Sequence, residues 1–296
     1  MDQPTSVGVQ GASQSKVRRR YIGSELCPSL MPSVRDLEAA LASHADPESS
    51  RWTLVTPTQT NASLKELRSL LDFLALAVPD AEIVANDWGV VRLLRRYPFP
   101  ISLGRMFLKN KRDPRISSLF GQLPAVLQAR YRRSNVLNAS FVRLAREHGV
   151  TRLEIDAPPW GLDPEKLMSA GIEMHLRYPF TLVTTSRACP SAAVANAPPR
   201  FGKARHARQD ASIEARACDC SRPCVSRKLQ LNNPGLGAPL YLFGNGFFTR
   251  AGPLSELLVE PLARLLYQPE GPLADATVLS AEEAHALDQT ALLAED

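Results

Sequence analysis

Helix-type segments alternate with short β-type segments along this chain of 296 residues, and that alternation limits the folds available to it. Five runs rich in β-branched or apolar residues are bounded by Pro, Gly, Asn or Asp, which predicts strands. They are Trp52 to Thr56, Glu82 to Ala85, Pro100 to Leu103, Arg152 to Ile155 and Thr181 to Thr185. Such alternation is typical of β/α units around a parallel sheet, and the length suits one β/α barrel. We therefore expect an α/β fold of that kind.

The helix signals are N-cap residues, capping boxes and apolar residues at helical spacing. They predict helices from Ser33 to about His44, after a capping box at Ser63 to Glu66, from Ser134 to His148, from Asp163 to Gly171, from Leu254 to Tyr267 with an interruption at Pro261, and after Ser280. Together with the five strands, these helices predict a chain that alternates between the two types of element.

Polar side chains follow several predicted strands. The tetrapeptides that begin at Arg96 and Arg177 are both Arg-Tyr-Pro-Phe, and we expect them to form equivalent turns that lead into barrel strands. In a parallel barrel the functional face lies beyond the strand C-termini. The residues expected there are Asn86, Asp87, Arg105, Asp156 and Arg187. Each is either a direct ligand or, more commonly for such positions, a helix cap or a rim ion pair.

No targeting signal is expected at the N-terminus. Met1 to Lys16 is polar, and no apolar stretch follows Arg18, Arg19 and Arg20, so neither a signal peptide nor an anchor is expected. No run approaches the roughly 20 apolar residues of a membrane helix. We expect a disordered tail over 1–20, a single barrel-like domain over 21–296, no membrane span and a cytoplasmic location.

The chain is mildly basic, with a net charge of +5 from 35 Lys and Arg against 30 Asp and Glu. The excess is uneven, because basic residues crowd the stretch from Lys109 to Arg133. A solvated surface explains this stretch most simply, since no aromatic interleaving in it suggests base stacking. An anionic partner is the alternative interpretation.

The cysteines carry the strongest functional signal. Four of the five are Cys189, Cys218, Cys220 and Cys224, and the fifth is Cys27. The segment between Pro190 and Ala217 has no periodicity and predicts a long irregular loop with cysteines at both ends. In a reducing compartment disulfides have little use, so thiols crowded this closely indicate a metal or cluster.

Spacing alone leaves the nature of this site open. Cys220 and Cys224 supply a local pair, Cys189 and Cys27 follow β-type segments and are expected to reach the same point, and Cys218 is then spare. An iron-sulfur cluster takes four thiolates that need not be contiguous. A structural zinc ion uses the same ligands but usually as two close pairs. Free cysteines that bind nothing are the third interpretation.

Several segments occur in an order that resembles a known family. Tyr21 to Cys27 is similar to a YLGxxxC segment, Glu82 to Val91 to a strand followed by a D-x-G-v-v helix start, and Thr185 to Cys189 to a YSARC element. With the closing pair Cys220 and Cys224, the chain resembles the collagenase-like peptidase family U thirty-two, most closely its UbiV-like iron-sulfur branch. The resemblance covers about residues 21–241.

This resemblance implies a modified or incomplete β/α (TIM-like) barrel with a long cysteine-bearing loop. It implies a 4Fe-4S cluster on Cys27, Cys189, Cys220 and Cys224, and zinc stays the alternative. It further implies a part in oxygen-independent hydroxylation in ubiquinone biosynthesis, as a heterodimer with a UbiU-like paralogue and with a quinone precursor as substrate. It names no catalytic residue.

Other functions stay open beside it. Branches of the same family hydroxylate tRNA, and the basic stretch 109–133 would then contact phosphate. A peptidase needs a nucleophile and a base, yet no serine or cysteine occurs in a nucleophile-elbow context. Pro179 and Phe180 also stand where the peptidase signature has Gly or His before its strand. The sequence therefore favours an iron-sulfur protein over a peptidase.

Overall fold

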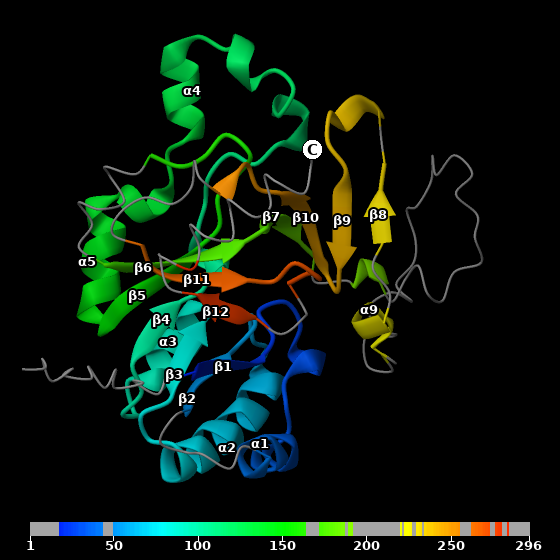
Figure 1. The fold of residues 1–296 in the computed structure, drawn as a ribbon. Coiled ribbons are helices and arrows are strands. Elements are labelled where there is room, and N and C mark those ends of the chain that lie inside the picture. Colours follow the sequence, from blue (N-terminus) through cyan, green and yellow to red (C-terminus); the bar gives the residue numbers. More distant parts are fainter. Residues whose placement is uncertain are drawn as a thin grey trace, which may run out of the picture.

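The fold is known from a computed structural model of the whole chain. It describes residues 18–43, 50–163, 172–186, 189–191, 220, 222–226, 229–232, 234–254, 262–272, 276–279 and 283. These residues form a large parallel sheet with helices around it and a smaller antiparallel sheet beside it (Figure 1).

The large sheet has eight strands in the order β1-β2-β3-β4-β5-β6-β11-β12. All neighbouring pairs are parallel except β11 and β12, which are antiparallel. The strands are β1 Arg18–Gly23, β2 Ser50–Val55, β3 Glu82–Ala85, β4 Ile101–Leu103, β5 Val150–Ile155, β6 Glu173–Tyr178, β11 Leu262–Tyr267 and β12 Thr277–Leu279. Because β12 also contacts β1, the sheet is a nearly closed barrel. The predicted α/β class and barrel-like architecture are confirmed at this level.

Helices follow the barrel strands and cover the outside of the sheet. They are α1 Val34–Ala42, α2 Asn61–Ala77, α3 Trp88–Leu94, α4 Ala125–Tyr131 and α5 Ala139–Glu147, with short 3-10 helices η1 Pro28–Leu30, η2 Arg105–Phe107, η3 Pro114–Ile116, η4 Phe120–Gln122, η5 Asn135–Leu137 and η7 Pro234–Leu236. The apolar core lies between these helices and the outward faces of the strands, where Leu71, Ile83 and Leu153 are almost fully buried. Burial of this apolar surface is the main stabilising contribution to such a fold.

The predicted helix starts are partly confirmed. Ser33 caps α1 with a capping box, because its hydroxyl accepts from the Asp36 amide and Asp36 accepts from the Ser33 amide. The capping box placed at Ser63 to Glu66 was wrong by one turn, since α2 begins at Asn61 and its capping box joins Thr60 to Ser63. The helix predicted from Ser134 to His148 is split into η5 and α5, because Asn138 ends the first and caps the second.

The smaller sheet has the strand order β7-β10-β9-β8, all antiparallel. Its strands are β7 Phe180–Thr185, β10 Gly246–Arg250, β9 Leu240–Phe243 and β8 Leu229–Leu231, and the short helix α9 Pro223–Ser226 precedes it. The strand predicted at Thr181 to Thr185 therefore exists but belongs to this sheet. The two Arg-Tyr-Pro-Phe tetrapeptides are not equivalent turns, because the first joins α3 to β4 and the second runs from the end of β6 into β7.

The helix predicted from Leu254 to Tyr267 was wrong in its second half. Leu262–Tyr267 is β11, which pairs in parallel with β6 and buries Leu265 and Leu266. Its leucines and alanine suit a helix, but the barrel needs a strand at this place and tertiary packing overrides such local preferences.

Several predictions concern chain ends and loops. β1 begins at Arg18, so the barrel includes the last three residues of the range 1–20 that we expected to be a tail. The helix expected at Asp163 to Gly171, most of the loop between Cys189 and Cys220, and most of the last seventeen residues lie outside the described residues. Among the described helices, none combines the length and the apolar character needed to cross a membrane.

Candidate metal centre

The four cysteines predicted as ligands come from separate parts of the fold. Cys27 lies between β1 and η1, and Cys189 follows β7. Cys220 and Cys224 flank the start of α9, which contains Cys224. All four carry free thiols, and Cys224 is buried while the other three are half-buried. The fifth, Cys218, lies outside the described residues.

These four thiols lie close enough to influence one another. Burial, followed by the charges of Cys189, Cys220 and Cys27, raises the pKa of Cys224 to about 11. Interactions between charges weaken with distance, so all three partners are near neighbours of Cys224. The fold thus brings two cysteines from distant parts of the chain to the local pair.

Thiol sulfurs are the donors that both a 4Fe-4S cluster and a structural zinc ion take. Thiolates crowded together need nearby positive charge to ionise, and the irons of an iron-sulfur cluster supply it. Within the described part of the chain, no group of three or more His, Cys, Asp or Glu side chains is arranged to hold a metal ion.

The segment that carries Cys189 is fixed by the turn between β9 and β10. The Cys189 thiol donates to the carbonyl oxygen of Gly244 at 3.6 Å, and the Ser191 hydroxyl donates to the same oxygen at 2.7 Å. On the other side of the turn, Asn245 donates through its side chain to the Ser186 carbonyl at 3.0 Å. The antiparallel sheet therefore determines where Cys189 lies.

The segment that carries Cys27 is fixed on the barrel. Gly23 ends β1 with a φ of 99°, and a Cβ there would lie 2.3 Å from the carbonyl oxygen of Val55, so only glycine fits. The Ser24 amide then donates to that same oxygen at 3.1 Å. Cys27 itself packs against an apolar cluster formed by Leu26, Phe180, Leu182, Phe243 and Phe248.

Arg105 links the two cysteine-bearing segments. Only 1% of Arg105 is exposed, and its Nε donates to both carboxylate oxygens of Glu25, at 3.0 and 2.9 Å. Its Nη1 donates to Asp156 at 3.2 Å and to the carbonyl oxygen of Phe180 at the start of β7. Its guanidinium also lies over the ring of Phe248. One side chain thereby joins the residues before Cys27 to the strand before Cys189.

Asp156 completes this link to β7. Its carboxylate accepts from the Leu182 amide at 2.7 Å and pairs with Arg112, which donates to the Leu182 carbonyl. Burial opposes ionisation of Glu25, but the charges of Arg105 and Arg177 hold the pKa of Glu25 below its ordinary value. The Glu25 carboxylate is therefore a charged partner of buried arginines.

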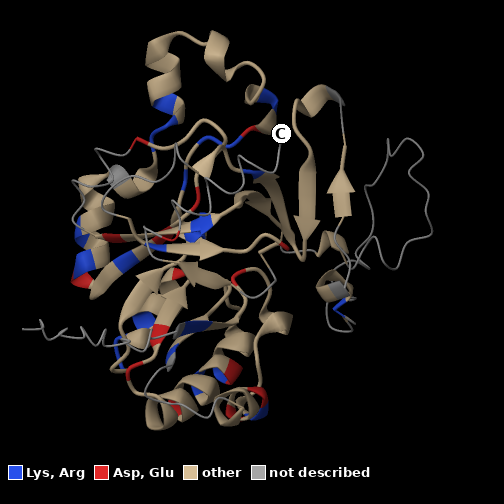
Figure 2. Cartoon of the chain, viewed as in Figure 1, with Lys and Arg blue, Asp and Glu red and all other residues tan. Residues whose placement is uncertain are grey.

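A second group of ion pairs lies inside the barrel, in addition to the contacts of Arg105 and Asp156. Arg177 donates to Glu154 at 2.7 Å and to Gln268 at 2.9 Å. Around Glu82, three arginines from β1, β5 and β11 converge, namely Arg19, Arg152 and Arg264. Figure 2 shows basic and acidic residues on the strands of the large sheet. The interior of this barrel is thus filled by charged side chains.

Sequence analysis missed these interior residues, although a signal was present. In β5 the charged residues are Arg152 and Glu154, and in β6 they are Glu173 and Arg177, always separated by an even number of positions. Alternation with period two places such residues on one face of a strand. In a closed barrel that face points inward, so the pattern indicates an ionic interior.

The residues expected at the C-terminal rim are structural there. The Asn86 side chain donates to the Thr56 carbonyl at 2.8 Å and accepts from the Met106 amide. Asp87 caps α3 and accepts from the Gln59 amide at 2.6 Å. These residues and Asp156 therefore hold loops together, and Arg187 lies outside the described residues.

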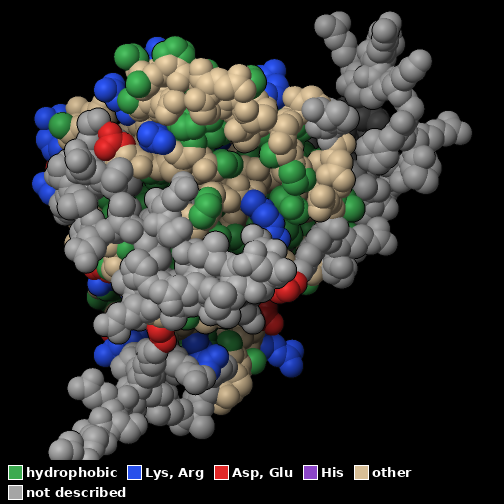
Figure 3. All heavy atoms as spheres, turned by 45° about the horizontal axis from the view of Figure 1, so that its top comes forward, with side chains coloured by type: hydrophobic (Ala, Val, Ile, Leu, Met, Phe, Trp, Pro, Cys, Tyr) green, Lys and Arg blue, Asp and Glu red, His purple; other side chains and the backbone are tan. Residues whose placement is uncertain are grey.

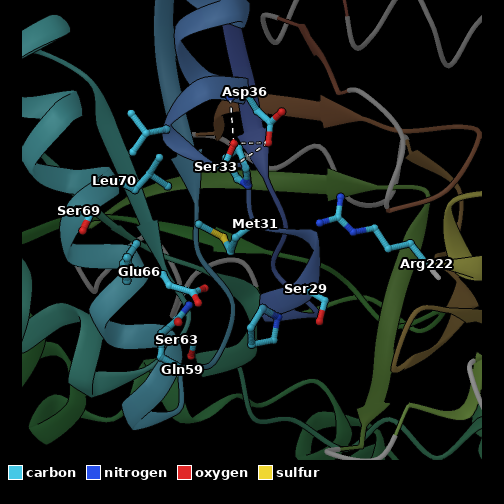
Figure 4. Close-up of a pocket in the computed structure, with 14 residues that line it drawn as sticks. Ser29, Met31, Ser33, Asp36, Gln59, Ser63, Glu66, Ser69, Leu70 and Arg222 are labelled. Atoms are coloured by element: carbon cyan, nitrogen blue, oxygen red, sulfur yellow. Dashed lines mark hydrogen bonds between the residues drawn. The ribbon is translucent and has the colours of Figure 1, made fainter. Parts of the chain in front are cut away.

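A pocket of about 430 Å³ lies beside the cysteine-bearing segments (Figure 4). Its walls are the residues from Pro28 to Asp36 other than Leu30 and Arg35, the start of α2, and Arg222 between Cys220 and Cys224. Pro28 directly follows Cys27, so two of the walls continue from the thiols.

Comparison of the chain with family models, with curated proteins and with solved structures found no match.

Proposed function

We propose that Cys27, Cys189, Cys220 and Cys224 hold a 4Fe-4S cluster. The observation that carries this proposal is the approach of Cys27, Cys189 and Cys220 to Cys224, which shifts the ionisation of its thiol. Four free thiols supply the complete ligand set of such a cluster.

The proposed activity is oxygen-independent hydroxylation in ubiquinone biosynthesis, with a UbiU-like paralogue as the partner of a heterodimer. The resemblance of the segments around Cys27, Cys189 and Cys220 to the UbiV-like branch supports this assignment, and the barrel-like fold agrees with it. A bound cluster supplies one-electron transfer. The substrate in this proposal is a quinone precursor.

In this proposal, other residues of the chain position the segments that carry the cluster ligands. Arg105 and Asp156 hold the two cysteine-bearing segments on the barrel through buried hydrogen bonds. The apolar cluster of Leu26, Phe180 and Phe248 excludes water from the side of Cys27 that faces the barrel. Exclusion of water lowers the local dielectric and stabilises bonds between thiolate and metal.

The test is preparation of the full chain without oxygen, followed by iron and sulfide analysis and visible spectroscopy. We expect about four irons and four sulfides per chain if one 4Fe-4S cluster is bound. Cys27→Ala should lose the cluster, and Cys218→Ala, the matched control, should keep it. The reverse pattern would show that the ligands are misassigned. A colourless protein with one zinc would overturn the cluster in favour of zinc.

Hydroxylation of RNA is a second candidate, favoured by one surface. α4 projects from the barrel, and Arg130, Arg132 and Arg133 at its end are exposed. Basic and hydrophobic side chains are both exposed on the face turned forward in Figure 3. Lys111 and Arg132 also lie over the rings of Tyr131 and Phe120, so aromatic residues do accompany this basic stretch.

Purification from cells separates the two candidates. The first predicts that a paralogous chain or a quinone precursor copurifies with the protein. The second predicts copurifying RNA that is lost at high salt, because phosphate contacts are salt-dependent. Loss of RNA in an Arg130→Gln, Arg133→Gln variant with unchanged iron content would favour the RNA function.

A further inference from the structure

The pocket beside the cysteines has an apolar floor and charged sides. Leu67 and Leu70 of α2 are buried beneath it, and Met31 lies at its centre (Figure 4). Glu66 lies on the α2 side and Arg222 on the opposite side. The pocket therefore offers an acidic group and a basic group that are separated by apolar surface.

The charged side chains of Glu66 and Arg222 are both exposed, and neither forms a side-chain hydrogen bond or an ion pair with another described residue. Hydrogen bonds from Ser33, together with the more distant charge of Arg222, lower the pKa of Asp36. Asp36, the other carboxylate of the pocket, is occupied, because it accepts from the Ser33 amide at 2.9 Å and hydroxyl at 2.7 Å. Glu66 and Arg222 are therefore the groups available to a ligand.

The helix ends at the pocket are also occupied. Ser33 and Asp36 satisfy the first turn of α1, and Thr60 and Ser63 satisfy that of α2. A bound anion at these amides would have to displace existing caps. A charged ligand in this pocket is consequently recognised by side chains and not by the helix-terminal amides.

Arg222 has an unusual backbone. Its φ of 56° makes it the one described residue other than glycine with a positive φ. Left-handed conformations are uncommon for such residues and are retained where the surrounding structure requires them. In this conformation the Arg222 side chain extends toward the pocket from between the two cysteines (Figure 4).

We propose that this pocket binds a small organic acid with an apolar body and a hydrogen-bond donor at its far end. Arg222 takes the carboxylate, Met31, Leu67 and Leu70 contact the body, and Glu66 accepts from the donor. The volume of about 430 Å³ is within the range of small-molecule sites.

The position of the pocket connects it to the candidate centre. Arg222 is two residues from both Cys220 and Cys224, and Pro28 follows Cys27. The pocket is therefore lined by residues close in sequence to three of the proposed ligands. Binding of the acid requires only the pocket. The further step, that this acid is the compound on which the protein acts, rests on the function proposed above.

The experiment is calorimetric titration of the intact chain, prepared without oxygen, with 3-(4-hydroxyphenyl)propionate. Its methyl ester lacks the charge for Arg222, and 3-phenylpropionate lacks the donor for Glu66. We expect the parent acid to bind and each analogue to bind about tenfold more weakly, as for loss of a hydrogen bond to a charged group. Equal affinity for the acid and its ester, or no saturable binding of the acid, would overturn the proposal.

Two variants assign the contacts. Arg222→Asn keeps a residue that tolerates a positive φ, and it should weaken the acid about tenfold but leave the ester unchanged. Glu66→Gln should weaken the hydroxylated acid more than 3-phenylpropionate. Arg35→Gln removes a charge from the exposed side of α1 outside the pocket and should change neither. A uniform effect of all three variants would contradict the proposal.

Iron content of the same samples separates the two proposals. Binding of the acid to protein that never contains iron would overturn the cluster and leave the pocket standing. A full cluster in protein that binds none of the three compounds would overturn the pocket and leave the cluster.

Discussion

Arg105 and Glu25, which are 80 residues apart in the chain, form a two-point contact in the buried interior, with Arg105 Nε donating to both carboxylate oxygens. Glu25 lies two residues before Cys27, and Arg105 also holds the first residue of β7, which leads to Cys189. The position of two cysteines thus depends on one ion pair.

Removal of Arg105 should destabilise the protein strongly. Arg105→Gln leaves Glu25 charged and buried without its main partner, which costs about 3 to 5 kcal/mol in comparable pairs. Urea unfolding followed by circular dichroism measures this loss. The matched control is Arg51→Gln, which breaks an exposed pair with Asp80 and should cost less than about 1 kcal/mol. Equal losses in the free energy of unfolding for the two variants would show that the buried pair stabilises the protein no more than the exposed pair.

A milder substitution should affect the position of Cys27 without unfolding the protein. Glu25→Gln keeps the shape of the side chain but weakens its contact with Arg105, so the segment before Cys27 loses its charged anchor. We expect protein prepared without oxygen to retain its circular dichroism spectrum and to contain less than half the iron of the wild type. Glu38→Gln, an exposed change on α1, is the control and should keep its iron. Full iron content in Glu25→Gln would show that this anchor does not position the thiol.

Local signals in the sequence were sufficient for much of the barrel. The strand at Glu82 to Ala85 was predicted with the observed bounds, because four buried apolar-rich residues are flanked by Asp and Asn. The start of α1 at Ser33 was also predicted, since a capping box depends only on residues within one turn. Where an element is specified by its own residues, the sequence predicts it.

Elements specified by distant partners were not predicted. β11 has a helix-compatible composition and becomes a strand by pairing with β6. β7 was predicted as a strand, but its place in the antiparallel sheet was not, because that place depends on pairing with β10. The contact between Arg105 and Glu25 likewise depends on closure of the barrel. The four cysteines could be chosen from the sequence by type and spacing, but the residues that hold them in place could not.

The stability of the barrel should depend on pH through Glu173. A hydrogen bond from His175, at 2.7 Å, and nearby positive charge lower the pKa of Glu173 to about 2. A carboxyl with a lowered pKa in the folded state stabilises the protein above its unfolded pKa, and this contribution is lost as pH falls toward 2. Glu173 is partly exposed, so the contribution is modest. Between pH 5 and 2, the wild type should lose more stability than Glu173→Gln, measured by urea unfolding at each pH. Parallel curves would contradict this assignment.

A pair of glycines with similar backbone conformations should respond differently to substitution. Gly23 and Gly149 have φ values of 99° and 75°, but a Cβ at Gly23 would lie 2.3 Å from the Val55 carbonyl oxygen, and a Cβ at Gly149 would meet nothing within 4 Å. Gly149→Ala should therefore cost only the conformational penalty of about 1 to 2 kcal/mol. Gly23→Ala carries the same penalty and must also push β1 away from β2, which moves the segment that ends at Cys27. Thermal unfolding should show a clearly larger fall in Tm for Gly23→Ala, with a loss of iron that Gly149→Ala does not show. Equal falls in Tm would mean that the contact between Gly23 and Val55 relaxes without cost.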